Sequence, residues 1–152
     1  MNRVTFKGRV LRSVMGCFLG FSMVTPVMAS ESADEREVIW VSADEKAVLL
    51  SEMRAFLEAS QRILEGSLAD DMEVIEEAAR SVGMKMMRAT PKELHKKLPS
   101  GFTALGPKAH RGFEAIADEA SAMGDREMVL QHLAKLQKTC NSCHSIYRFE
   151  VK

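Results

Sequence analysis

Residues 125–148 read DREMVLQHLAKLQKTCNSCHSIYR, and this stretch decides how the rest of the chain can fold. Asp125 suits a helix N-cap, because its carboxylate can accept hydrogen bonds from the free N–H groups of the first turn. Apolar or weakly polar positions then recur at intervals of four and three, at Val129, Leu133, Leu136, Cys140, Cys143 and Tyr147. The spacing predicts a helix that turns this stripe, with both cysteines on it, toward a core.

Three earlier segments show the same helical spacing, at residues 42–66, 67–86 and 107–124. Ser42 and Glu45 predict a capping box at the start of the first, and Ser67 is the expected cap of the second. Pro107 suits the first turn of the third. Residues 89–107 contain three prolines, which exclude one long helix there.

The remaining segment, residues 30–41, is acidic and weakly patterned, so we expect a short mobile lead into the first helix. No strand-like alternation competes with the four helical segments. Four amphipathic helices with one long connection favour an all-α fold, an antiparallel four-helix bundle.

The first 29 residues have the order of a secretory signal peptide. Four basic residues come first, an apolar run follows over residues 14–24, and Val27 and Ala29 suit a signal peptidase. The apolar run has about half of the roughly 20 residues that a spanning helix needs, so a retained anchor is the weaker alternative. We expect cleavage after Ala29, export to the periplasm, and a mature domain of residues 30–152 with no stable membrane insertion.

The charge of the mature domain argues against one class of partner. The chain has 21 basic and 21 acidic residues, and the first 29 hold four basic residues and no acidic one. The mature domain therefore has 17 basic and 21 acidic residues, a net charge of −4. A nucleic-acid binder would concentrate basic residues instead, so we expect no nucleic-acid partner.

Cys140-Asn141-Ser142-Cys143-His144 has the Cys-x-x-Cys-His pattern that is typical of covalent haem attachment. Both thiols add to vinyl groups of the haem, and the adjoining imidazole binds its iron. On a helix, a spacing of three places both sulfurs on one face. The sequence therefore predicts one haem c, attached through Cys140 and Cys143 and ligated by His144.

Three other uses of the cysteines fit less well. A thioredoxin-like pair needs a strand before it and a helix that starts at the first cysteine. A disulfide between cysteines three residues apart in a helix would be strained. A zinc site would need a fourth ligand, for which the candidates are His95, His110 and His132. We otherwise expect these three histidines to be ordinary surface residues.

Four helices that end in Cys-x-x-Cys-His-x-x-Tyr-Arg, here residues 140–148, resemble the class II cytochromes c, the cytochrome c-prime family. The resemblance covers the mature chain in helix layout, and its C-terminal motif is the specific part. It implies a haem inside the bundle, with its proximal face toward the fourth helix and its distal face toward the first. Arg148, one helical turn beyond His144, matches the family arginine near the proximal imidazole.

The same resemblance places the distal position of the haem at Met53. A thioether is a competent sixth ligand, and a His/Met pair raises the potential of electron-transfer cytochromes. The alternative is that Met53 only fills a gap in the core. Leu49 stands where the family often has an arginine that binds a haem propionate, which is a departure from the pattern.

We therefore expect a carrier of single electrons that exchanges them with redox partner proteins, not an enzyme with catalytic residues. The alternative is a five-coordinate haem protein that binds nitric oxide or carbon monoxide. A peroxidase would need a polar acid or base on the distal side, and the first helix offers Leu49, Met53 and Phe56 there. The acidic surface of the second helix could dock a basic partner, and the resemblance implies that two copies can form a homodimer through the first two helices.

Overall fold

The computed structural model describes residues 34–122 and 124–152, so the expected signal peptide of residues 1–29 lies outside the described part. The described chain is mostly helical, which confirms the all-α class, with one small pair of strands added to it. Its elements, in chain order, are β1 (Glu37–Val41), α1 (Ala43–Ala69), α2 (Met72–Ser81), α3 (Met84–Ala89), α4 (Lys92–Lys97), α5 (Ser100–Ala122), α6 (Arg126–Ile146) and β2 (Tyr147–Val151). None of the helices in this part of the chain is long and apolar enough to cross a membrane.

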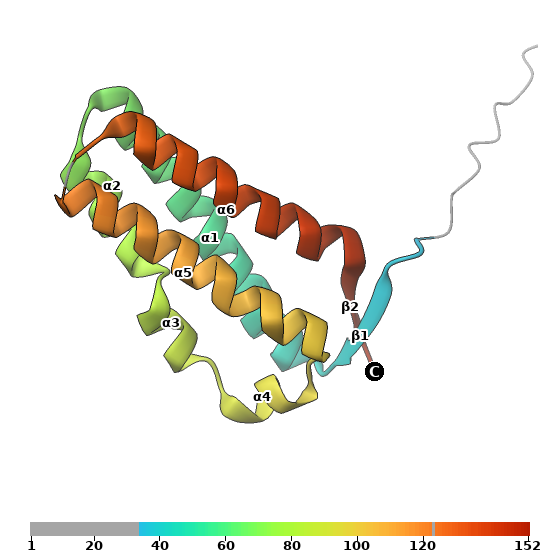
Figure 1. The fold of residues 1–152 in the computed structure, drawn as a ribbon. Coiled ribbons are helices and arrows are strands. Elements are labelled where there is room, and N and C mark those ends of the chain that lie inside the picture. Colours follow the sequence, from blue (N-terminus) through green and yellow to red (C-terminus); the bar gives the residue numbers. More distant parts are fainter. Residues whose placement is uncertain (1–33, 123) are drawn as a thin grey trace, which may run out of the picture. The chain divides into compact units, whose positions relative to one another are not determined.

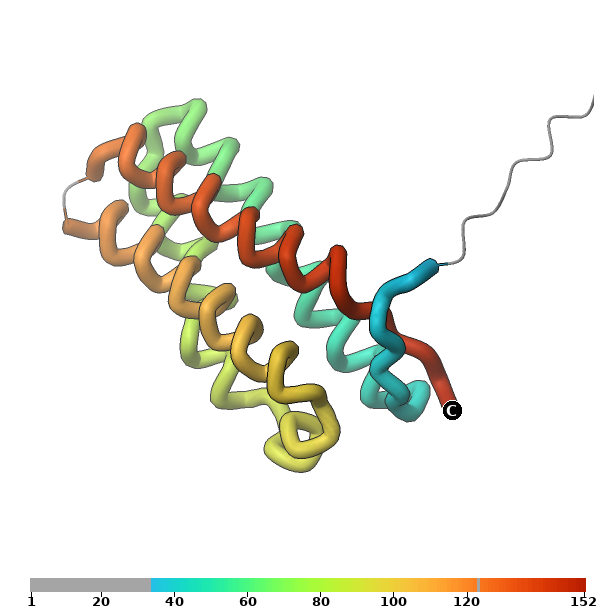
Figure 2. Tube along the Cα trace, turned by 45° about the vertical axis from the view of Figure 1, so that its right-hand side comes forward, coloured from blue at the N-terminus to red at the C-terminus, as the bar shows by residue number. Residues whose placement is uncertain are grey.

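The long helices α5 and α6 lie side by side, and α6 also lies beside the third long helix, α1 (Figures 1 and 2). The shorter α2 packs against both α1 and α5, and α6 packs against α5 and more sparsely against α1. The two short helices α3 and α4 connect α2 to α5. This arrangement leaves the C-terminal half of α6 facing the N-terminal half of α1.

The start of α1 agrees with the sequence-based prediction and its end does not. The capping box is confirmed, since Ser42 Oγ accepts from Glu45 N at 3.2 Å and Glu45 Oε2 accepts from Ser42 N at 2.8 Å. The expected end at Gly66 is wrong, because α1 continues to Ala69. Ser67 therefore caps nothing, and its hydroxyl instead donates to Ile63 O at 2.7 Å.

Gly66 serves packing between helices. A Cβ added there would lie 2.7 Å from Ile75 Cγ1, so the missing side chain lets α2 approach α1 closely. The actual cap of α2 is Asp71, whose Oδ1 accepts from Val74 N at 3.1 Å. The expected second helix also divides, because α2 ends at Ser81 and α3 starts after Gly83.

The expected start of the third long helix at Pro107 is wrong, because α5 begins at Ser100 and contains this proline. Phe102, in the first turn, is buried, and this packing extends the helix before the proline. The end of the helix is as predicted, since Gly124 has a φ of +64° and its N–H donates to Glu119 O. Asp125 caps α6 through hydrogen bonds from Glu127 N and Met128 N.

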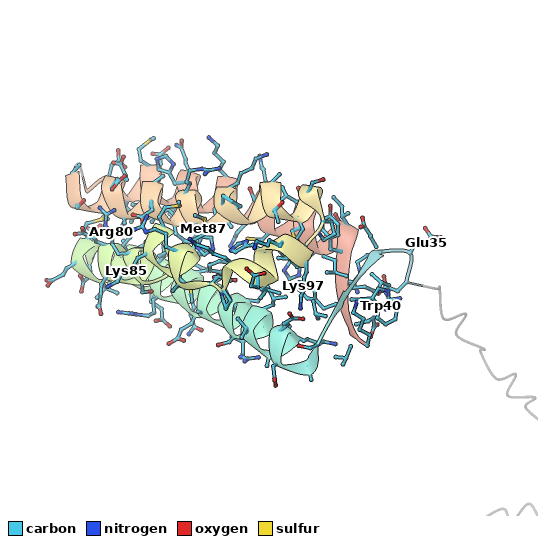
Figure 3. All side chains as sticks on the ribbon, turned by 90° about the horizontal axis from the view of Figure 1, so that it is seen from below. Glu35, Trp40, Arg80, Lys85, Met87 and Lys97 are labelled. Atoms are coloured by element: carbon cyan, nitrogen blue, oxygen red, sulfur yellow. The ribbon has the colours of Figure 1, made fainter. Side chains whose placement is uncertain are left out.

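The strand pair is the main feature that sequence patterning missed. β1 pairs in parallel with β2, from Glu37 opposite Tyr147 to Val41 opposite Val151. Residues 37–41 are therefore not a mobile lead, because Ile39 and Val41 are buried. Trp40 alternates with them and is 52% exposed at the outer side of the pair (Figure 3).

The core consists of two clusters. The larger one joins α1, α2, α5 and α6 around Phe113, which stacks on Phe56 with ring centroids 5.3 Å apart. The smaller one joins the strands to the starts of α1 and α5 and to α4, through Ile39, Val41, Leu49, Leu94, Leu98 and Phe102. Cys140 packs against the larger cluster and Cys143 against the smaller one. The cysteine motif thus lies where the two clusters meet.

Candidate functional site

The last turns of α6 present the predicted motif. Cys140 and Cys143 are both free thiols and both half-buried, while His144 is exposed beside them. Val129, Leu133 and Leu136 anchor the same helix in the larger cluster, as the spacing predicts. The packing of α6 therefore fixes the direction in which the two sulfurs point.

Both cysteines and His144 line one pocket, which is partly open to solvent. The pocket has mostly apolar walls, as cofactor sites do. The wall opposite α6 comes from α1 and includes Met53. The remaining apolar lining includes Leu49, Phe56, Met87, Leu98, Phe102 and Ala109. Four of the five predicted site residues are thus brought to one pocket: Cys140, Cys143, His144 and Met53.

Burial affects the chemistry of the thiols. It raises the pKa of Cys140 and of Cys143 above the usual range of a thiol. Thiol–disulfide exchange of the thioredoxin type depends on a thiolate with a lowered pKa. The surroundings of the two sulfurs therefore favour neutral thiols over an exchange-active pair.

The fifth predicted residue, Arg148, lies elsewhere than expected. It does not continue the helix one turn beyond His144, because α6 ends at Ile146 and Arg148 belongs to β2. Its Nη1 donates to Glu150, and its Nε lies 3.7 Å from Asp34 Oδ2. Arg148 lines a second pocket that also borders His144, so β2 places it near the motif although it is not on the same helix.

A polar pair in the pocket wall was missed. The expectation that His110 is a surface residue is wrong, since it is only 4% exposed and lines the pocket. Its Nδ1 lies 2.8 Å from Val82 O and its Nε2 3.4 Å from Glu52 Oε1. Burial acts to lower the pKa of His110, but its hydrogen bonds and the charge of Glu52 outweigh burial and raise it. Helical spacing could have found it, because His110 lies one turn before buried Phe113.

The other two histidines differ in their surroundings. His95 is half-buried and lines the same pocket, so it is not the ordinary surface residue expected. His132, also half-buried, lines a separate groove between α5 and α6. Within residues 34–122 and 124–152, no three His, Cys, Asp or Glu side chains are arranged to hold a metal ion.

A second methionine of the pocket was also missed. Met87 of α3 (labelled in Figure 3) lines it. Met86, which helical spacing places on the apolar stripe, packs against the larger cluster. A new helix, α3, begins after Gly83 and contains both methionines. Met87 lies one residue beyond the segment 67–86 whose spacing predicts a helix.

No family model, curated protein or solved structure matches the chain.

Proposed function

We propose that this chain is a c-type cytochrome that transfers single electrons. The observation that carries the proposal is the pocket into which one helix brings two thiols and an imidazole, with Met53 on the opposite wall. A haem held there would supply the one-electron change of its iron. Cys140 and Cys143 would hold its ring through thioether bonds, and His144 would bind its iron.

The walls of the pocket suit a flat apolar ring. Leu49 and Phe102, on different elements, belong to the smaller cluster, and Phe56 belongs to the larger one. These side chains would keep water from the ring and set a low local dielectric, which is one of the means by which a protein tunes a haem potential. No protein nucleophile is needed for this function, and we assign no catalytic residue.

The fold that we propose for this function is the antiparallel four-helix bundle of the class II cytochromes c. The neighbour relations support it, because α1 packs on α2, α2 on α5, α5 on α6 and α6 on α1, which closes a ring of four. The short helices α3 and α4 would be the long connection of that bundle. The strand pair β1–β2 is an addition at the end of the bundle that carries the motif.

A second function uses the same pocket. If Met53 does not bind the iron, the distal side would be open to a small gas such as nitric oxide or carbon monoxide. Glu52 and His110 favour this alternative, because they put a buried pair of polar groups into a mostly apolar wall. A diatomic ligand on haem iron responds to hydrogen-bond donors and polarity near it.

Compartment and partners follow from the rest of the chain. Residues 1–29 have the order of a signal peptide, so we propose that the cytochrome works in the periplasm and exchanges electrons with other redox proteins there.

The acidic surface of α2 is less suited to docking a basic partner than its sequence suggests. Glu76 and Glu77 each lie in an ion pair with an arginine of the chain itself, Arg80 and Arg62.

The test is covalent attachment. The chain is produced with a working cytochrome c maturation system, and haem is stained after denaturing electrophoresis. We expect one haem per chain that survives denaturation, and its loss when Cys140 and Cys143 are both changed to alanine. Ser142→Ala, an exposed change between the cysteines, is the matched control and should keep the haem. A colourless product would reject the proposal, and one zinc per chain would favour the zinc alternative.

A further inference from the structure

A second pocket, also partly open to solvent, adjoins the candidate haem pocket. The two share Met53, Phe102, Cys143 and His144, so they are neighbouring parts of one cavity system around the motif. The second pocket differs in its charge. Its lining includes three cationic side chains and, among the residues that the structure describes, no acidic one.

The three cations are Arg36, Lys46 and Arg148. Lys46 comes from the first turns of α1 and Arg148 from β2, while Arg36 directly precedes β1. The parallel pairing of the strands brings Arg36 and Arg148 together, although 112 positions separate them in the sequence. The fold thus assembles three basic side chains at this pocket from three parts of the chain, and acids outside its lining pair with two of them, Arg36 and Arg148.

Two of these cations have unused binding capacity. Arg148 Nε is buried and has no hydrogen-bond partner, because the carboxylate of Asp34, at 3.7 Å, is beyond hydrogen-bond distance. Nη1 of the same group donates to Glu150. Lys46 takes part in none of the ion pairs found among the described residues, whereas Arg36 is paired with Asp34 at 2.6 Å. A buried donor without a partner is costly, and such an atom in a native structure points to a missing acceptor.

The acceptor should be a carboxylate. Haem carries two propionate carboxylates on its ring edge, and a carboxylate taken out of water needs cations or hydrogen-bond donors around it. The position at which the family resemblance expects an arginine for this purpose holds Leu49, an apolar and buried residue. Lys46 precedes Leu49 by three residues, close to one helical turn, and lines the cationic pocket.

We propose that Lys46 and Arg148 bind the propionate carboxylates of the haem, an inference that rests on the proposed function. Arg36 is a positioning residue of this site. It fixes Asp34 beside Arg148, and its Nη1 donates to His144 O at 3.3 Å. Lys46 of α1 and Arg148 of β2 therefore supply together the propionate site that Leu49 cannot provide.

The experiment compares Lys46→Gln with Arg54→Gln in the haem-loaded protein. Both changes remove one positive charge from α1, but Arg54 is exposed and lines neither pocket. Loss of Lys46 should lower the reduction potential, because a nearby cation disfavours the more positive ferric state. It should also shift the resonance Raman band of propionate bending, which responds to the hydrogen bonds of the carboxylates. Arg54→Gln should leave the Raman band in place and change the potential less.

Arg148→Lys is the second variant, since it keeps the charge and loses Nε. It should shift the propionate band with little change in potential. If Lys46→Gln matches Arg54→Gln in both readouts and Arg148→Lys leaves the Raman band unmoved, the inference is overturned while the cytochrome assignment stands. If denaturing electrophoresis shows no covalent haem in any of these proteins, the proposed function fails and the inference fails with it.

Discussion

Arg36 Nη1 donates a hydrogen bond to the backbone carbonyl of His144, at 3.3 Å and across 108 positions of sequence. The contact ties the segment before α1 to the end of the helix that carries the cysteine motif. Asp34 holds the other side of the guanidinium, and hydrogen bonds from Arg36 lower the pKa of Asp34 to about 2. The candidate ligand is therefore braced by a part of the chain that helix patterning treats as a lead.

This bracing depends on burial in β1, so Ile39→Ala should destabilise the fold. Ile39 is 3% exposed in the cluster that packs against Cys143, and a large-to-small change at such a position costs about 2–5 kcal/mol. The midpoint of urea unfolding should fall accordingly. Trp40→Ala in the same strand is the control, because Trp40 is half-exposed and should cost much less. Equal losses in the two variants would contradict the strand pairing.

Replacing His144 by glycine should change the spectrum of the iron while the thioether bonds keep the haem attached. Added imidazole should restore much of the original spectrum, because His144 is exposed and its removal leaves a path to the iron. His132→Gly is the control, since His132 lies on the same helix and lines a different groove. An unchanged axial spectrum in His144→Gly would mean that another residue binds the iron.

Met53 tests the choice between the two proposed functions. If it binds the iron, the ferric protein should be low-spin with a weak red band of sulfur-to-iron charge transfer, and Met53→Ala should lose that band. Met87→Ala is the essential comparison, because Met87 is the other methionine of the pocket. Loss of the band only in Met87→Ala would reassign the ligand. A high-spin wild-type protein that binds carbon monoxide freely would favour gas binding.

The residues changed in these tests also show how much of the candidate site could be predicted from the sequence. The residues of the motif are next to one another in the chain, and Met53 follows from helical spacing and the resemblance, so local pattern suffices to nominate them. The caps at Ser42 and Asp125 and the turn at Gly124 are likewise local chemistry and could be predicted, but the C-terminal end of α1 could not. Gly66 is the exception, because its role depends on how closely α2 approaches.

What the sequence could not give depends on contacts between distant segments. β1 and β2 stabilise each other only as a pair, and neither alternates over enough residues to stand out from its neighbours. Glu52 and His110 look like two surface residues until α1 and α5 bring them together in the pocket wall. The cationic pocket arises in the same way, since its three cations come from separate elements.

The pair of Glu52 and His110 should show strong coupling in a double-mutant cycle. His110→Leu leaves a mostly buried carboxylate with only the hydroxyl of Thr90, at 3.3 Å, as a partner. Loss of one partner from a buried pair typically costs about 3–5 kcal/mol, whereas loss of both can be nearly neutral. Urea unfolding should therefore show less destabilisation in Glu52→Leu/His110→Leu than the sum of the single changes. Additive losses would mean that the two side chains do not interact.

The pH dependence of stability should have one identifiable source at the start of α1. The hydrogen bond from Lys97 lowers the pKa of Glu45 below its usual value, with help from the Ser42 backbone. A carboxyl whose pKa is lower in the folded chain binds fewer protons there than in the unfolded chain. The stabilisation of the fold by ionised Glu45 is therefore present above the unfolded pKa, near 4.3, and is lost as the pH falls through the folded pKa.

Glu45→Gln should unfold more easily than wild type at pH 7, and the difference in free energy of unfolding should shrink below about pH 4. Glu93→Gln is the control, because among the described residues Glu93 pairs with Lys96 alone, on its own short helix. A difference between wild type and Glu45→Gln that stays constant from pH 7 to pH 3 would contradict the role given to the capping box and Lys97.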